Sequence, residues 1–201
     1  MRLVFASNNA HKLDEVRRIL PAGIEVLSLS DIGFEAEIEE TGTTLKQNSA
    51  IKAETVYQWL RVTGYGLPVD GVFADDTGLE IDALGGQPGV YTARWAGEPA
   101  ANRKKALAEL KGITDRGAQF RTVITLIKFS AISDQYSETQ VSGVVRGRIA
   151  EEEYGQGGFG YDPVFIPEGY DKTFGELPAE VKNSISHRSR ALAALVKALN
   201  C

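Results

Sequence analysis

The chain has 201 residues, of which 43% are hydrophobic and 24% charged, and these values exclude a disordered or fibrous protein. Its formal net charge of -5 argues against a nucleic-acid groove, which needs a basic surface. Cys201 is its single cysteine, which excludes an internal disulfide and a thiolate metal site. With no signal-like N-terminus and no apolar run near the ~18 residues of a membrane span, we expect a cytoplasmic protein that binds neither membrane nor nucleic acid.

A strand, a tight polar loop and a helix are predicted at the start of the chain. Leu3 to Ala6 is apolar, residues 7–9 (Ser-Asn-Asn) supply helix caps, and apolar residues then recur at helical spacing until Pro21. Free N–H groups at a helix start bind anions, and Lys12 in the first turn would reach a phosphate. The alternative is a solvated surface lysine. Ile24 to Leu29 alternates as a second strand.

A second polar group is predicted around a long helix from about Thr44 to Thr63. It follows Phe34 to Glu40, where apolar and acidic residues alternate. Asn48 and Lys52 are one turn apart and therefore share a face of the helix, which starts beside Glu40. These three side chains would serve a metal ion and a phosphate together. A polar surface face is the alternative.

Two adjacent acidic residues, Asp75 and Asp76, follow the apolar stretch Val72 to Ala74. Neighbouring strand residues point to opposite faces, so both carboxylates face one pocket only if the strand ends there. We expect the strand to end at Ala74, with one aspartate contacting a cation and the other supporting it. Carboxylate oxygens suit Mg²⁺, which would bridge them to substrate phosphates. An ordinary acidic turn is the alternative.

The middle of the chain predicts a mixed sheet with an antiparallel part. Gly and Pro residues interrupt the loop 84–91, and a short charged helix is expected from Asn102 to Lys111. Gln119 to Phe129 and Glu138 to Ile149 are rich in β-branched residues, and they form a plausible hairpin through the polar turn near Ser133 and Asp134. We find no repeat and no linker.

A glycine-rich segment, 155–163, surrounds Phe159 and Tyr161. Glycines let the backbone approach a ligand closely, and an aromatic ring offers a face for a base. A connector whose aromatic residues belong to the core is the alternative. Val164 to Ile166 is expected to continue as a strand.

The last predicted helix runs from about Ser186, a good N-cap, to Leu199. His187 and Arg188 open its first turn, and Lys182 lies just before it. The helix dipole also favours negative charge there. A lone histidine at a helix start more often has a structural role.

Seven motifs, in this order along nearly the whole chain, resemble those of the inosine triphosphate pyrophosphatase family of nucleotide diphosphatases. They are Ser7-x-Asn9-x-x-Lys12-x-x-Glu15, Glu40-Thr41-Gly42, Asn48 with Lys52-Ala53, Ala74-Asp75-Asp76-Thr77-Gly78-Leu79, Pro88-Gly89-Val90-Tyr91, Gly158-Phe159-Gly160-Tyr161-Asp162-Pro163 and Ser186-His187-Arg188.

The resemblance implies an elongated α/β fold in one domain, residues 1–201, with a mixed β-sheet and flanking helices that form two lobes around a central cleft. It also implies a homodimer. Members of the family hydrolyse inosine, deoxyinosine and xanthosine triphosphates to the monophosphate and pyrophosphate with Mg²⁺, and so remove deaminated purines from the nucleotide pool.

Residue roles follow from the same resemblance. Asp76 would activate the attacking water and bind the metal together with Glu40. The implied substrate-binding residues are Ser7, Asn8, Asn9, Ala10, His11, Lys12, Lys52, Thr77, Phe159, Gly160, Tyr161, Asp162, Lys182, His187 and Arg188.

Three positions depart from the family pattern. Gln47 stands where the family usually has Glu, which removes a carboxylate and is expected to lower metal affinity. Thr77 replaces the commoner serine but keeps the hydroxyl, and His11 stands where many relatives have glycine and has no separate role. Two alternative functions stay open: a diphosphatase for other modified nucleotides, and a nucleotide-binding module without turnover, for which Gln47 is the single hint.

Overall fold

The computed structural model describes residues 1–64, 68–129 and 136–199. Contacts divide the chain into two compact units. Unit 1 consists of Met1–Asp76, Val123–Ser142 and Ala191–Cys201, and unit 2 of Thr77–Thr122 and Gly143–Arg190. The boundary therefore falls inside three strands and one helix.

Helices and strands alternate along the first half of the chain, and two long neighbouring strands follow. The elements are β1 (Arg2–Phe5), α1 (Ala10–Ile19), β2 (Glu25–Leu27), α2 (Leu45–Thr63), β3 (Gly71–Ile81), the 3₁₀ turn η1 (Asp82–Leu84), β4 (Pro88–Gly89), α3 (Pro99–Glu109), β5 (Gly117–Phe129), β6 (Tyr136–Ile149), the 3₁₀ turn η2 (Asp162–Val164), β7 (Phe165–Pro167), α4 (Ala179–Ile185) and α5 (His187–Leu199).

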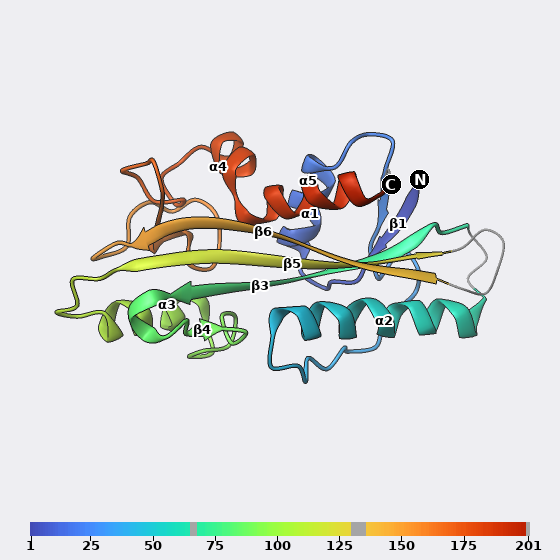
Figure 1. The fold of residues 1–201 in the computed structure, drawn as a ribbon, viewed down its shortest axis with the longest axis horizontal. Helices are drawn as coiled ribbons and strands as arrows, with labels where there is room; N and C mark the ends of the chain where they lie inside the picture. Colours follow the sequence, from blue (N-terminus) through green and yellow to red (C-terminus); the bar gives the residue numbers. More distant parts are fainter. Residues whose placement is uncertain (65–67, 130–135, 200–201) are drawn as a thin grey trace. The chain divides into compact units, whose positions relative to one another are not determined.

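Seven strands among the described residues form one mixed sheet (Figure 1). Its order is β2-β1-β3-β5-β6-β7, and β4 pairs with β3. β1 runs parallel to both β2 and β3, whereas β4 is antiparallel to β3 and β7 is antiparallel to β6. The predicted α/β class, a mixed sheet with flanking helices, is confirmed.

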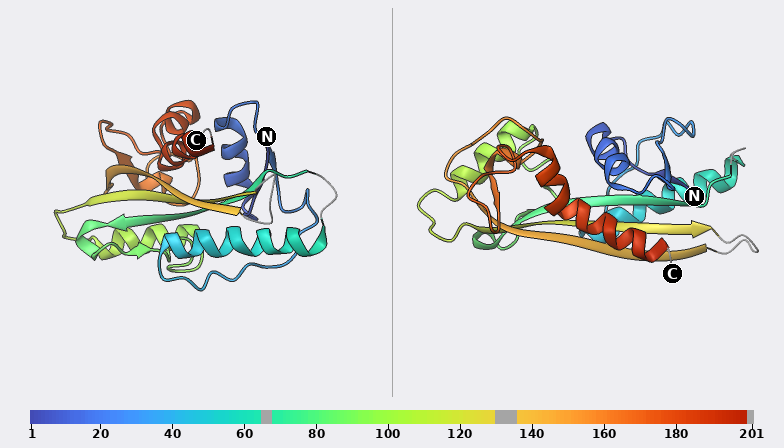
Figure 2. Two further views of the ribbon diagram at one scale, coloured as in Figure 1. Left: turned by 45° about the vertical axis from the view of Figure 1, so that its right-hand side comes forward. Right: turned by 90° about the horizontal axis from the view of Figure 1, so that it is seen from above.

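In unit 1 the strands are covered on both faces. Leu3 and Phe5 of β1 pack in one core with residues of α1 and α5, while Val4 and Ala6 pack in a second core with residues of α2. Figure 2 shows α1 and α2 on opposite faces of these strands. Because a strand between two helical layers has no solvent face, its sequence is continuously apolar, as observed for 3–6.

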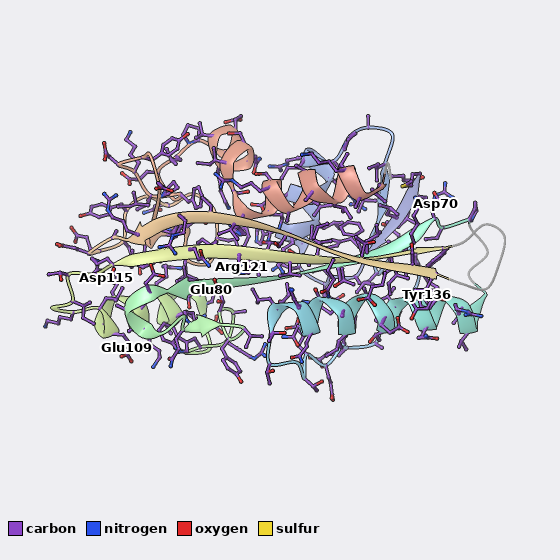
Figure 3. All side chains as sticks on the ribbon, in the orientation of Figure 1. Asp70, Glu80, Glu109, Asp115, Arg121 and Tyr136 are labelled. Carbon is purple, nitrogen blue, oxygen red and sulfur yellow. The ribbon has the colours of Figure 1, made fainter. Side chains whose placement is uncertain are left out.

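The described core of unit 2 is built from the other ends of the long strands, from residues 161–174 and from α3. Leu79 and Ile81 of β3 and Phe120 of β5 are buried in it. Glu80, between the two buried β3 residues, points to the other face and accepts a hydrogen bond from Arg121 Nε at 3.3 Å (Figure 3). The period-two alternation of a strand therefore holds through this part of β3 and β5.

One prediction about this region is wrong: the strand does not end at Ala74. β3 continues through Asp75 and Asp76 to Ile81, and both aspartates are buried. The turn alternative is wrong for the same reason. A strand carries two buried carboxylates here because each of them meets a lysine ammonium, which offsets the cost of removing the charge from water.

Other differences concern element boundaries. Val164 belongs to a 3₁₀ turn, so β7 begins one residue later than the predicted strand. α4 precedes Ser186 and was not predicted. Residues 34–40 form neither helix nor strand, and the predicted turn at Ser133 and Asp134 lies outside the described residues.

Candidate active site

The loop between β1 and α1 presents the first group of predicted residues. Asn9 caps α1, since its Oδ1 accepts a hydrogen bond from Lys12 N at 3.1 Å, and Ser7 Oγ accepts one from Asn9 N at 3.3 Å. Residues 8–11 are exposed. Lys12 Nζ donates to Asp75 Oδ1 at 2.9 Å, and its side chain is only 15% exposed. The surface-lysine alternative is therefore wrong.

Lys52 joins two carboxylates in unit 1. Its Nζ lies 2.7 Å from Glu40 Oε1 and 3.2 Å from Asp76 Oδ1. The side chains of Lys52 and Asp76 are 9% and 10% exposed, while that of Glu40 is 29% exposed. Strand alternation sends Asp75 to Lys12 and Asp76 to Lys52, so each aspartate has its own cation. The polar-surface alternative for this helix face is wrong.

The turn before α2 places Glu40 beside Lys52. Asn48 is fully buried, and its Oδ1 accepts a hydrogen bond from Gly42 N at 2.8 Å. A Cβ atom at Gly42 would lie 2.6 Å from that Oδ1, so the approach requires glycine. Gln47 Oε1 accepts from Thr43 N at 2.9 Å, which caps the start of the helix. Gln47 therefore has a local structural role that an amide fulfils without a charge.

Burial and charge act in opposite directions on these groups. Burial raises the pKa of Asp76, Lys52 opposes this effect, Glu40 adds to it, and the net pKa is raised. For Lys52, burial lowers the pKa but the carboxylates of Asp76, Asp75 and Glu40 outweigh it, so the net pKa is raised. Asp76 Oδ2 is buried and makes no hydrogen bond within the described residues. This oxygen can take a proton, a water molecule or a cation.

The donor set fits Mg²⁺ delivered with phosphates. No three His, Cys, Asp or Glu side chains gather as a metal cage in the described ranges. Magnesium does not require such a cage, because it is usually bound by one or two carboxylates, retained waters and substrate phosphates. Glu40 and Asp76 could supply those carboxylates, and the buried Asp76 Oδ2 makes no hydrogen bond within the described residues.

Unit 2 contains the second group, centred on Asp162. Its Oδ2 accepts hydrogen bonds from Lys182 Nζ at 2.8 Å and from Phe159 N at 2.7 Å. Lys182 Nζ also lies 4.5 Å from the centre of the Phe159 ring, a cation–π contact. Gly158 has φ +73°, and a Cβ atom there would overlap the Asp162 carboxylate. A glycine is needed at this turn for both reasons.

His187 and Arg188 lie at the start of α5, where Ser186 Oγ accepts a hydrogen bond from Ser189 N as predicted for an N-cap. Arg188 is 2% exposed, and its guanidinium carbon lies 5.8 Å from the centre of the Phe159 ring. His187 is 5% exposed and its imidazole stacks on a buried phenylalanine of β5. The helix start therefore holds one guanidinium beside Phe159 and one imidazole inside the core.

Two predicted substrate residues have structural partners. Tyr161 is 3% exposed and belongs to the core of unit 2, and its hydroxyl donates to Thr92 O at 3.2 Å. Burial raises the pKa of Tyr161. The hydroxyl oxygens of Thr77 and Thr122 lie 2.8 Å apart. Gly160, which directly precedes Tyr161, is half-buried, and its backbone has φ +61°.

Sequence reasoning missed two residues of α3 that hold loops of unit 2. Asn102 Oδ1 accepts from Ala96 N, and its Nδ2 donates to Ala93 O at 3.0 Å. Arg103 Nη1 donates to Gly160 O at 2.9 Å, a contact that spans 57 residues. The sequence shows only a short charged helix here, and no local pattern identifies such distant partners.

A cavity of about 400 Å³ in unit 1 is lined by none of the predicted site residues. Its charged side chains already pair, because Arg2 contacts Glu25 at 2.9 Å and Asp70 accepts a hydrogen bond from Arg2 N (Asp70 is labelled in Figure 3).

No helix within the described ranges combines the length and apolar character that crossing a bilayer requires.

The fold and the two groups define an α/β protein with cations and carboxylates suited to a phosphorylated ligand, and an aromatic ring flanked by cations. The chain belongs to the Ham1 family, whose sequence model matches residues 3–198. The resemblance predicted from the seven motifs is therefore confirmed.

Close relatives cover the whole chain. A dITP/XTP pyrophosphatase of Flavobacterium johnsoniae is 47% identical over 202 residues, covering 99% of this chain and 98% of that protein. The dITP/XTP pyrophosphatase of Porphyromonas gingivalis is 48% identical over 204 residues, with 100% and 98% covered. The structure of the Staphylococcus aureus Ham1 protein matches with a TM-score of 0.83 and 38% identity, over 100% of this chain and 98% of that one.

Proposed function

We propose that this protein is a Mg²⁺-dependent nucleoside triphosphate diphosphatase that hydrolyses deaminated purine nucleotides, ITP, dITP and XTP, to the monophosphate and pyrophosphate. The names of the relatives support the substrate class. The observation that carries the mechanism is Lys52, whose ammonium joins Glu40 and Asp76 while Asp76 Oδ2 is buried and makes no hydrogen bond within the described residues.

Lys12 and Lys52 bind the phosphates in this proposal. Each ammonium contacts a carboxylate, and these ion pairs hold both lysines in place. A triphosphate carries more negative charge than either carboxylate and therefore attracts both ammonium groups more strongly. Neutralising and orienting the phosphates in this way accounts for much of the catalysis of phosphoryl transfer.

Asp76 is the general base. Its Oδ2 takes a proton from a water molecule as that water's oxygen bonds to the α-phosphorus, and the bond from the α-phosphorus to the bridging oxygen breaks. Pyrophosphate leaves with the electron pair of that bond. The raised pKa of Asp76 makes its carboxylate a better proton acceptor than an ordinary aspartate.

Glu40 and Asp76 would hold the metal ion, which when bound withdraws negative charge from the phosphate oxygens. Glu40 is 29% exposed and Asp76 10% exposed, and a magnesium ion bound by one or two carboxylates usually retains several waters.

The purine is assigned to the group in unit 2. Phe159 offers a ring face, and Arg188 is a donor that cannot lose its proton. Deamination replaces the 6-amino donor of adenine with a 6-keto acceptor. Arg188 would donate a hydrogen bond to that keto oxygen, whereas with adenine two donors would face each other. Asp162 keeps Lys182 in place beside the ring.

A panel of ITP, dITP, XTP, ATP, GTP and halogenated pyrimidine triphosphates, assayed with and without Mg²⁺, tests the proposal. We expect pyrophosphate and monophosphate in equal amounts, from the deaminated purines, and only with Mg²⁺. Preference for a pyrimidine would show a diphosphatase for other modified nucleotides. Binding without turnover, or release of orthophosphate, would also overturn the proposal.

Homodimeric assembly, which the resemblance implies, and a cytoplasmic location, which is expected from the sequence, belong to the same proposal. Light scattering of the purified protein tests the first. Fractionation of cells that express the chain tests the second.

A further inference from the structure

Arg103 contacts the glycine-rich segment of unit 2 at two points. Its Nε donates to Glu153 Oε2 at 2.9 Å, and its Nη1 donates to the backbone oxygen of Gly160 at 2.9 Å. The Arg103 side chain is 17% exposed. Because a guanidinium is planar and carries its N–H groups at fixed angles, one residue can hold both acceptors in a defined relation.

The segment between these two acceptors is conformationally permissive. Gly155, Gly158 and Gly160 all have positive φ, and the residues from 153 to 158 are exposed. Glycine loses more conformational freedom on folding than any other residue, so such a segment needs contacts that fix it. Arg103 supplies them from a regular helix, α3.

Gly160, whose carbonyl oxygen accepts the hydrogen bond from Arg103, is the residue directly after Phe159. The ring of Phe159 lies 4.5 Å from Lys182 Nζ and 5.8 Å from the guanidinium carbon of Arg188. Any shift of the Gly160 carbonyl moves the backbone that carries this ring. The hydrogen bond from Arg103 to Gly160 and the one from Phe159 N to Asp162 Oδ2 at 2.7 Å therefore both restrain the backbone that carries the ring.

We propose that Arg103 is a positioning residue for base recognition: by holding Gly160 and Glu153 it fixes the Phe159 ring beside Lys182 and Arg188. This inference rests on the proposed function, and it assigns Arg103 no contact with the nucleotide. The inference concerns base binding rather than phosphate binding, because both hydrogen-bond acceptors of Arg103 belong to the segment that carries Phe159. Holding the segment in its bound shape before binding raises affinity by reducing the ordering cost.

Three variants test this role. Arg103→Met removes both contacts, Arg103→Lys keeps the charge but lacks the planar pair of donors, and Lys104→Met removes one positive charge from an exposed neighbour on the same helix. For each variant, kcat and KM are measured with ITP. The inhibition constant of inorganic tripolyphosphate, which has no base, is measured in the same assay, and thermal unfolding checks the fold.

We expect Arg103→Met to raise the KM for ITP about 10-fold, less than the two lost hydrogen bonds could contribute because Arg103 acts on the nucleotide only through the segment it holds, with kcat nearly unchanged. The inhibition constant for tripolyphosphate should stay at its wild-type value. Arg103→Lys should recover part of the loss, and Lys104→Met should behave as the wild type.

Two results would overturn the role of Arg103. An unchanged KM would show that the contacts do not matter, and equal losses for ITP and tripolyphosphate would show a general structural role instead. Both presuppose wild-type turnover of ITP. If the wild-type protein bound tripolyphosphate but released no pyrophosphate from ITP, the proposed function itself would be wrong.

Discussion

Replacing Lys52 with methionine removes the ammonium that contacts Glu40 and Asp76 but keeps an unbranched side chain of similar length. Two carboxylates then share a site without their cation. Breaking a buried ion pair by removing one partner costs about 3–5 kcal/mol. We expect about 3 kcal/mol, the lower end of that range, because Glu40 is 29% exposed and water solvates part of its charge.

The pH dependence of this loss has a definite sign. Lys52 has a raised pKa, so its stabilising effect is fully present at neutral pH and is lost only as the pH rises through that pKa. Without Lys52, the already raised pKa of Asp76 rises further. Protonation of Asp76 then favours the folded state, and the destabilisation of Lys52→Met relative to the wild type shrinks as the pH falls from 7 toward 5.

Urea unfolding followed by tryptophan fluorescence measures this difference, since Trp59 lies in unit 1 and Trp95 in unit 2. Lys46→Met, an exposed lysine on the same helix, is the control. Lys52→Met should also bind Mn²⁺ more tightly than the wild type in the absence of nucleotide, because the ammonium no longer lies between the carboxylates. A Lys52→Met protein as stable as Lys46→Met, with unchanged Mn²⁺ affinity, would refute the reasoning.

Three further predictions concern the same groups. Asp76→Asn should lower kcat for ITP by at least ~10²-fold, as loss of a general base does, with nucleotide binding retained in equilibrium titration; near-normal turnover at saturating Mg²⁺ would contradict the assignment. Glu40→Gln should lower the pKa of Asp76 in the metal-free protein, measured by NMR titration, because the Glu40 charge raises it. Arg188→Met should lower kcat/KM for ITP by at least ~10-fold. The ratio of kcat/KM for ITP to that for ATP should fall, whereas the ratio for ITP to GTP should stay nearly the same, since guanine also carries the 6-keto oxygen. Equal losses of kcat/KM for ITP and ATP would instead place Arg188 at a phosphate.

Local sequence signals were enough for most of the secondary structure and for the family. The apolar stripe predicted a helix from about Thr44 to Thr63, and the structure has α2 at Leu45–Thr63 with Thr44 as its cap. The alternation rule states that neighbouring strand residues face opposite sides, and it applies to Asp75 and Asp76 because β3 continues past Ala74, contrary to the prediction. Such features depend on residues a few positions apart, whose relation is set by the helix or strand period alone.

Contacts between distant segments required the tertiary structure. Whether β3 ended at Asp75 depended on Lys12, which lies 63 residues away and reaches that carboxylate from another element. The pairing of Lys182 with Asp162, and of Arg103 with Gly160, likewise arises only when separate segments pack together. Hydrophobic periodicity records which face of an element is buried, but it does not record which charged group from elsewhere will meet a buried carboxylate. That partner decides whether the carboxylate can stay inside a strand.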